Sequence, residues 1–130
     1  MNIALAIILE KNKVLIGKIR PEKVNEYGGL EYVFPCESIQ DINNIENELI
    51  NEIKKQTSLD ITIIHKIGER VHPSTQNHTY YFHCGKNAGQ DVVIAKNIDV
   101  ESFIWVGVDD LTNYMPTLFN ELKDYLEKVR

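Results

Sequence analysis

The sequence predicts a single α/β (α+β) domain, residues 1–130, in which a mixed β-sheet is packed between two main helices. Its 130 residues, 43% hydrophobic and 25% charged, suit one globular domain with one core. Runs rich in β-branched residues recur along the chain. Two segments instead repeat apolar residues at helical spacing. A sheet with one helix on each face is the economical way to bury both helical stripes.

The N-terminal part predicts three strands. Residues 3–9 and 13–19 are two apolar runs separated by Glu10-Lys11-Asn12, which is typical of a β-hairpin. Residues 20–30 are polar and end in two glycines, which predicts a loop. Residues 31–34 predict a third, short strand that is ended by the proline following it.

A helix is predicted next, ending near Thr57-Ser58. Its buried stripe shows helical spacing, at Ile42, Ile45, Leu49 and Ile53. Asn43 or Asn44 can cap its N-terminus, and from Asn43 a capping box would use Glu46. The last turn carries two lysines, whose charge suits the helix dipole.

The rest of the chain returns to strands and ends in a helix. The strand-like runs are residues 60–67, 79–84, 92–95 and 103–108. Residues 70–78 predict a turn because they combine Pro73 with small polar residues. The C-terminal helix, which Pro116 can start, has one apolar face, formed by Leu118, Phe119, Leu122, Tyr125, Leu126 and Val129. The predicted order is β-β-β-α-β-β-β-β-α.

Charge and cysteine content limit the partners and the location. The formal net charge of −5, from 14 Lys+Arg and 19 Asp+Glu, argues against binding a nucleic acid polymer. The apolar segment 1–9 is too short for a membrane span and is followed directly by charges, so we expect a buried strand and no membrane contact. Cys36 and Cys84 are interpreted as reduced thiols of a cytoplasmic protein.

Several segments, taken in order, resemble the Nudix (MutT-like) hydrolase family. They are residues 14–20, 30–35, the helix from Asn44, residues 70–75 with Tyr80-Tyr81, residues 104–111 and the final helix. The resemblance covers essentially the whole chain. It implies a Nudix-type mixed sheet between two helices, and hydrolysis of a nucleoside diphosphate linked to another moiety, with Mg²⁺ or Mn²⁺ as the cofactor.

The motif of this family, the Nudix box, has the pattern G-x5-E-x7-R-E-U-x-E-E-x-G-U, in which U is apolar. Residues 34–59 fit it without a gap, and Glu52, Ile53 and Leu59 match it. The other positions depart from it: Cys36 and Glu37 stand at the glycines, Asn43 at the first Glu, Asn51 at the Arg, Lys55 and Gln56 at the Glu pair, and Ser58 at the last Gly.

These departures remove most of the metal ligands that the resemblance implies. Hard divalent cations need several anionic oxygens, and in this register only Glu52 supplies one. A second register, shifted by one helical turn, brings in Glu48, which shares a helix face with Glu52. Glu48 and Glu52 are therefore the candidate catalytic and metal-binding residues, if the protein is active. A carboxylate from a later loop, Glu69 or Glu101, could complete such a displaced site.

Five residues are candidates for substrate binding. They are Arg20, Lys55, Arg70, His72 and Tyr81. By resemblance, the region of Arg70 and His72 faces the nucleotide-binding cleft, where a guanidinium can contact phosphate and a ring can stack on a base. The alternative is that Arg70 is a surface residue and one of the two adjacent tyrosines a core residue, since Tyr80 and Tyr81 must face opposite ways in a strand. Lys55 has an alternative as a solvated lysine at a helix C-terminus, and Cys36 is interpreted as a plain replacement for a loop glycine.

Three functions are compatible with the sequence. The first is a Nudix domain with weak or no hydrolase activity that binds a small nucleotide-like ligand. The second is an active hydrolase that uses a rearranged Mg²⁺ site. The third is a partner-binding or regulatory module without a small ligand. The oligomeric state stays open, a homodimer included.

Overall fold

The computed structural model describes residues 1–129 of the chain. β1 (Asn2–Glu10) and β2 (Lys13–Ile19) form the predicted hairpin, with Glu10 opposite Lys13. The two loop residues, Lys11 and Asn12, have φ values of 51° and 64°. Positive φ at both positions is the feature that matches a two-residue turn to the twist of its strands. The apolar N-terminal segment is thus a strand, as predicted.

The segment between the hairpin and the first helix is more structured than predicted. Residues 20–30 contain a 3₁₀-helix, η1 (Pro21–Tyr27), instead of only a loop. The single predicted strand is two short ones, β3 (Tyr32–Val33) and β4 (Cys36–Ser38). β3 pairs with β2 and β4 pairs with β1, so the chain changes partner strand at Pro35. The carbonyl of Pro35 still accepts the N–H of Ala6 at 2.8 Å.

The first long helix is α1 (Ile45–Thr57), with its end at the predicted place. Ile45, Leu49 and Ile53 pack toward the sheet, whereas Ile42 is 46% exposed and lies outside the buried stripe. The predicted capping box from Asn43 is wrong, because the N–H of Asn43 is bound by the Asp41 carboxylate at 3.0 Å. That bond caps a short 3₁₀-helix, η2 (Ile42–Asn44), which leads directly into α1.

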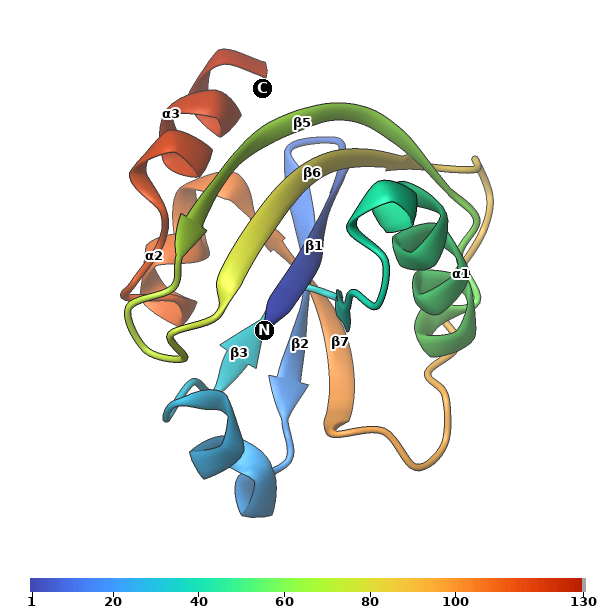
Figure 1. Cartoon of the computed structure of the whole chain (residues 1–130). Coiled ribbons are helices and arrows are strands. Elements are labelled where there is room, and N and C mark those ends of the chain that lie inside the picture. The colour runs from blue at the N-terminus through green and yellow to red at the C-terminus, as the bar shows by residue number, and fades with distance from the viewer. Residues whose placement is uncertain (130) are drawn as a thin grey trace.

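The sheet is mixed, as predicted. The remaining strands are β5 (Ile61–Val71), β6 (His78–Lys86) and β7 (Val100–Gly107). The strand order is β3-β2-β1-β6-β5, with β4 also pairing with β1 and β7 with β2. β1 and β6 are parallel, and the other pairs are antiparallel. The long, curved β5 and β6 arch over the hairpin in Figure 1.

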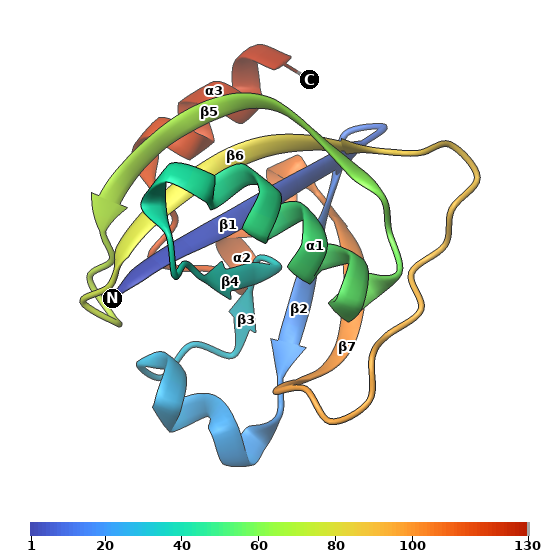
Figure 2. The ribbon, with the colours of Figure 1, turned by 45° about the vertical axis from the view of Figure 1, so that its right-hand side comes forward.

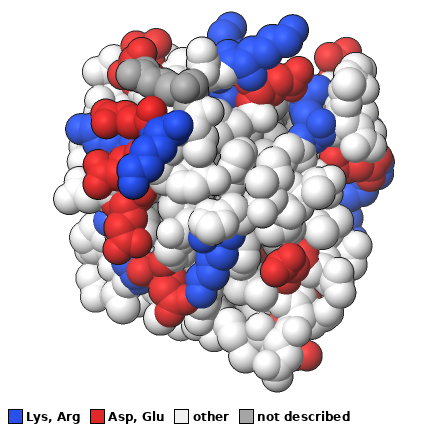
Figure 3. All heavy atoms as spheres, turned by 90° about the horizontal axis from the view of Figure 1, so that it is seen from above, with Lys and Arg blue, Asp and Glu red and all other residues white. Residues whose placement is uncertain are grey.

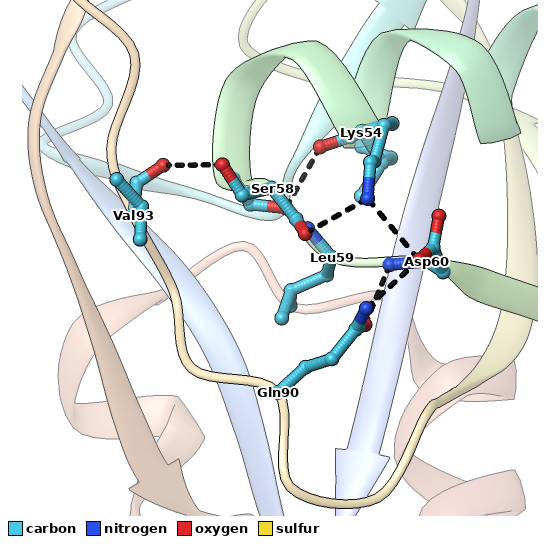
Figure 4. A network of polar contacts seen from close by, with 8 residues as sticks. Lys54, Ser58, Leu59, Asp60, Gln90 and Val93 are labelled. Atoms are coloured by element: carbon cyan, nitrogen blue, oxygen red, sulfur yellow. Dashed lines mark hydrogen bonds and ion pairs between the residues drawn. The ribbon is translucent and has the colours of Figure 1, made fainter.

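The predicted strand at residues 92–95 is wrong. This stretch is part of the connection 87–99, and its N–H groups bind carbonyls at the end of α1 instead of another strand: Val93 to Thr57 and Ala95 to Gln56, both at 2.9 Å. Figure 4 shows the same junction from close by, where Gln90 contacts Asp60. The connection is therefore fastened along the C-terminal end of α1.

The two faces of the sheet carry separate cores. On β1, Leu5 and Ile7 belong to one hydrophobic cluster, and Ala4, Ala6 and Ile8 to the other, as strand alternation requires. α1 covers the alanine face, while α2 (Leu111–Tyr114) and α3 (Asn120–Val129) cover the opposite face. Figure 2 shows α1 and α3 on opposite sides of the sheet. The predicted arrangement of a sheet between two main helices is confirmed.

The C-terminal helix begins later than predicted. Pro116 lies in the turn between α2 and α3, where the N–H of Leu118 donates to Met115 O at 3.2 Å. Leu118 and Phe119 precede the helix, and Leu122 and Leu126 form its buried stripe. None of the helices in residues 1–129 combines the length and apolar character needed to cross a membrane.

Candidate functional site

An apolar cavity of about 110 Å³ lies on the face of the sheet that α2 and α3 cover. Its walls come from the N-terminal half of β1, the region of β3, the end of β5, the start of β6, and the turn before α3. Most of the lining is apolar or aromatic. A few polar side chains reach it from β5, β6 and the turn between them, among them Arg70, His72 and Tyr81. Ligand sites of proteins have this composition.

Arg70, at the end of β5, is the charged group of the cavity. Its Nε donates to the Tyr81 hydroxyl at 3.1 Å, and its Nη2 donates to Thr117 O at 2.7 Å. The guanidinium lies over the Phe119 ring, 4.9 Å from its centre. Within residues 1–129, no carboxylate lies within ion-pair distance of Arg70. A half-buried charge without a counter-ion is able to attract an anionic or electron-rich ligand group.

His72, directly after β5, adds a neutral donor to the cavity. Its buried ring accepts the N–H of Ser74 at Nδ1, at 3.1 Å. This bond assigns the proton of the neutral ring to Nε2. Burial and, second, the charge of Arg70 lower the pKa of His72. The ring is therefore neutral at pH 7, and its Nε2 makes no hydrogen bond to another described residue.

The two adjacent tyrosines face opposite sides of the sheet, as predicted. Tyr81 is 2% exposed and lies on the cavity side, with its ring 4.9 Å from that of Phe119. Tyr80 lies on the other side and stacks on His78. Sequence reasoning missed Phe119 as a site residue, because its spacing fitted the apolar stripe of the C-terminal helix equally well.

Arg20 lies elsewhere, where it holds the connection 87–99. Its Nε donates to Ile98 O at 2.9 Å, and its own N–H donates to Asp99 O at 2.8 Å. Arg20 is not among the residues that line the cavity. Tyr27, which does line it, donates its hydroxyl to Asp99 at 2.7 Å, and burial and this bond raise its pKa. The connection thereby fixes η1 at the cavity.

The candidate catalytic Glu48 is bound to the backbone. Its two carboxylate oxygens accept the N–H groups of Gln40 and Asp41, each at 2.9 Å. These residues lead from β4 into α1. Glu48 therefore fastens the entry to its own helix, and both oxygens are in use.

Glu52 belongs to a second group of contacts, between α1 and β4. The side-chain nitrogen Nε2 of Gln56 donates to the Glu52 carboxylate at 3.1 Å and to Cys36 O at 2.9 Å. The Glu37 side chain hydrogen-bonds Glu52 as well. Burial, that bond and the charge of Glu52 raise the pKa of Glu37 to about 7. Sequence reasoning missed Glu37, because the box places it at a glycine.

A divalent cation does not fit these residues as they stand. Mg²⁺ and Mn²⁺ take several free oxygen ligands. Among residues 1–129, no group of three or more His, Cys, Asp or Glu side chains is arranged to hold a metal ion. Glu69 is paired with Lys66, and Glu101 with Lys18, so neither of these carboxylates extends the group on α1.

Lys55 and Cys36 are the two other box positions considered as functional candidates. Lys55 is exposed on α1 and does not line the cavity, so the structure does not bring it together with Arg70 and His72. Burial raises the pKa of the Cys36 thiol to about 12, which keeps it protonated and a poor nucleophile. Both cysteines are free thiols.

The comparisons with known proteins give solved structures only. No protein-family model matches the sequence, and no curated protein matches it either. The chain is similar to a Nudix hydrolase from Nitrosomonas europaea, with a TM-score of 0.71 and 16% identity over 98% of this chain and 70% of that one. An Ap4A hydrolase of C. elegans, in a binary complex, has a TM-score of 0.71 and 15% identity over 97% and 93% of the two chains.

A third similar structure is an ADP-ribose pyrophosphatase from Streptococcus suis, with a TM-score of 0.68 and 15% identity over 99% of this chain and 91% of that one. Identities this low show the fold and do not carry an activity from one chain to the other. The similarity nevertheless extends over nearly the whole chain in each case. The protein therefore has the Nudix fold.

Proposed function

We propose that this protein is a Nudix-fold domain that binds a small nucleotide-like ligand in the cavity of Arg70 and has little or no hydrolase activity. The observation that carries the proposal is Arg70 itself. Its guanidinium lies on Phe119 in an apolar cavity, without a carboxylate partner among residues 1–129. Such a group gains free energy when an acceptor-bearing ligand enters.

The cavity also favours a particular kind of ligand group. Tyr81 and Phe119 offer ring faces, while Arg70 and the Nε2 of His72 offer donors. A flat ring that carries hydrogen-bond acceptors satisfies both requirements, and a nucleobase is such a ring. Two of the similar structures are named for nucleotide derivatives, Ap4A and ADP-ribose, which supports this class of ligand.

Loss of hydrolase activity is supported by the state of the α1 carboxylates. Glu48 has both oxygens on backbone N–H groups, and Glu52 accepts a hydrogen bond from Gln56. Pyrophosphate hydrolysis of the kind the fold suggests needs a metal to neutralise charge and to activate water. The carboxylates that would hold it already accept hydrogen bonds from the protein's own backbone and from Gln56.

A small ligand agrees better with the surface charge than a polymer does. The net charge is −5. On the face seen in Figure 3, acidic and basic side chains are interspersed, and the described residues there form no continuous basic area. A nucleic acid backbone requires such an area. A cytoplasmic location and the oligomeric state stay predictions from the sequence.

The binding part is tested on the full chain in the presence of a chelator. ADP-ribose and Ap4A are titrated while the melting temperature is followed, and we expect a rise that saturates. Arg70→Gln should abolish the rise, and Lys123→Gln, an exposed change of the same charge on α3, should preserve it. No rise with any nucleotide would overturn the ligand proposal and favour a partner-binding module.

The activity part is tested with Mg²⁺ and Mn²⁺ on the same nucleotides. We expect the wild type to release product no faster than Glu52→Gln. Turnover that Glu52→Gln abolishes would overturn the proposal.

One observation favours the competing function, an active hydrolase with a rearranged metal site: the Glu37 carboxyl lies against that of Glu52, with the charge of Glu48 acting on Glu37 as well. To bind a cation, Glu48 would have to coordinate it with the lone pairs that its hydrogen bonds to Gln40 and Asp41 leave. Calorimetry of the wild type with Mn²⁺, with and without nucleotide, separates the two functions: uptake supports the hydrolase, and its absence supports the binding domain.

A further inference from the structure

The amide of Gln56 joins α1 to β4 at a point where oxygen atoms converge. Its Nε2 is 2.9 Å from Cys36 O and 3.1 Å from the Glu52 carboxylate. The carboxyl group of Glu37, the next residue of β4, hydrogen-bonds the same Glu52. One nitrogen therefore serves a main-chain carbonyl and a carboxylate from two different elements.

These oxygens are of the types that hard divalent cations take as ligands, carboxylates and backbone carbonyls. Without a positive or hydrogen-bearing group between them, the carbonyl of Cys36 and the carboxylate of Glu52 would face each other unfavourably. Gln56 supplies two N–H donors at that point. It stands at the second position of the Glu pair in the box, where a carboxylate would supply only further acceptors.

We propose that the Gln56 amide takes the place of a divalent cation in this protein. The nitrogen holds β4 against α1 by hydrogen bonds and closes the site to metal. This inference rests on the proposed loss of hydrolase activity and names its structural cause. Gln56 is a positioning residue, because it acts on Cys36 and Glu52 and not on a ligand.

Main-chain contacts fix the end of α1 that carries Gln56. The main-chain carbonyl of Gln56 accepts the N–H of Ala95 at 2.9 Å, from the connection 87–99. Just after the helix end, Ser58 Oγ donates to Val93 O at 3.4 Å. Lys54 Nζ lies 3.1 Å from the Asp60 carboxylate (Figure 4). Glutamate has the same length and shape as glutamine. Gln56→Glu therefore places an oxygen where the nitrogen lies and converts the junction to a set of carboxylates and one carbonyl.

The test measures Mn²⁺ binding by calorimetry, without nucleotide, at pH 7.5. We expect Gln56→Glu to bind Mn²⁺ at least about tenfold more tightly than the wild type, the size of effect that ligand-supporting groups have on metal affinity. Without metal this variant should melt at a lower temperature than the wild type, because its carboxylates repel one another. Added Mn²⁺ should restore the melting temperature.

The matched control is Asn51→Asp, which makes the same amide-to-carboxylate change on an exposed position of α1. It should neither gain Mn²⁺ affinity nor melt higher with Mn²⁺. Equal Mn²⁺ affinity in Gln56→Glu and Asn51→Asp would overturn the inference. Adding Glu52→Gln to the Gln56→Glu variant should remove the gain, and a gain that persists would also overturn it.

If Gln56→Glu does not fold, Gln56→Ala replaces it. That variant removes the nitrogen and leaves the oxygens, so it should bind Mn²⁺ more tightly than the wild type, and equal binding overturns the inference. The outcome is separable from that of the proposed function. A wild type whose melting temperature does not rise with nucleotide would refute the proposed ligand binding alone, whereas metal-dependent turnover by the wild type would refute both the proposed loss of activity and the role of Gln56. No Mn²⁺ gain with an inactive wild type would refute only the role of Gln56.

Discussion

The guanidinium of Arg70 lies 4.9 Å from the centre of the Phe119 ring, which joins the end of β5 to the segment that precedes α3. Tyr81 shares this contact, since its hydroxyl accepts from Arg70 and its ring packs on Phe119. The three side chains form one wall of the cavity. They give it an aromatic surface and a positive charge at the same point, which is the basis of the proposed ligand site.

Replacing Phe119 should weaken ligand binding specifically. Phe119→Leu removes the ring beneath Arg70, and we expect the nucleotide dissociation constant to rise about tenfold, in line with cation–π and stacking contributions. The variant should also lose about 1–2 kcal/mol of stability. Phe82→Leu is the control, because Phe82 is also buried, on the α1 side of the sheet. If both variants bind nucleotide alike, the aromatic wall is not the ligand site.

Glu48 should prove structural. Glu48→Ala removes the acceptors for the N–H groups of Gln40 and Asp41, and we expect it to lower the free energy of unfolding by about 1–2 kcal/mol. Nucleotide binding should stay unchanged. Urea unfolding of this variant is compared with that of Glu46→Ala, an exposed carboxylate two residues earlier in α1. An unchanged stability together with a lost activity would assign Glu48 to catalysis instead.

The Glu37 carboxyl should make stability depend on pH. Its pKa is raised from 4.5 to about 7, by burial, then by the hydrogen bond to Glu52 and the charge of Glu52. Between pH 4.5 and about 7, the Glu37 carboxyl is therefore protonated in the folded state and ionised in the unfolded state. The stabilisation is complete below pH 4.5 and disappears as the pH rises to about 7.

Glu37→Gln should remove this dependence, because its amide donates to Glu52 at any pH. Between pH 5 and pH 8, the free energy of unfolding of the variant should rise relative to that of the wild type by on the order of 1 kcal/mol, after discounting for the solvent exposure of this carboxyl. Urea unfolding of both proteins at pH 5 and at pH 8 measures this difference. Parallel pH profiles of the two proteins would contradict the assignment.

The pKa of the His72 ring should depend on the charge of Arg70. Burial and the charge of Arg70 lower the pKa of His72, so removing the charge in Arg70→Gln should raise that pKa while leaving it below 6.5. NMR titration of the ring protons measures it. His83 is the internal control, since its pKa is lowered by burial and by His65, not by Arg70. A shift of both histidines, or of neither, would show that Arg70 does not act on His72.

Most elements could be predicted because their signals are local. The hairpin of β1 and β2, the stripe of α1 and the opposite facing of Tyr80 and Tyr81 follow from strand and helix periodicity. The errors occur where a longer-range contact overrides a local pattern. Residues 92–95 have strand-forming side chains, yet their N–H groups bind the end of α1.

The candidate site was only partly predictable for the same reason. Arg70, His72 and Tyr81 were singled out, and the structure brings them to one cavity. Arg20 and Lys55 are also predicted to bind substrate, on other grounds, and lie outside it. A residue type shows what chemistry a side chain can perform, whereas its neighbours decide whether that chemistry is used.

The sequence by itself determined most of the strands, the two main helices and the loss of glutamates from the box, since these depend on residue type and spacing along the chain. Only the tertiary structure decided that Gln56 bridges Cys36 and Glu52, and that Arg70 lies on Phe119 without a counter-ion among residues 1–129. The Gln56–Cys36 and Arg70–Phe119 contacts each join two different elements. Their distances are set by how the sheet and helices pack, which no local periodicity encodes.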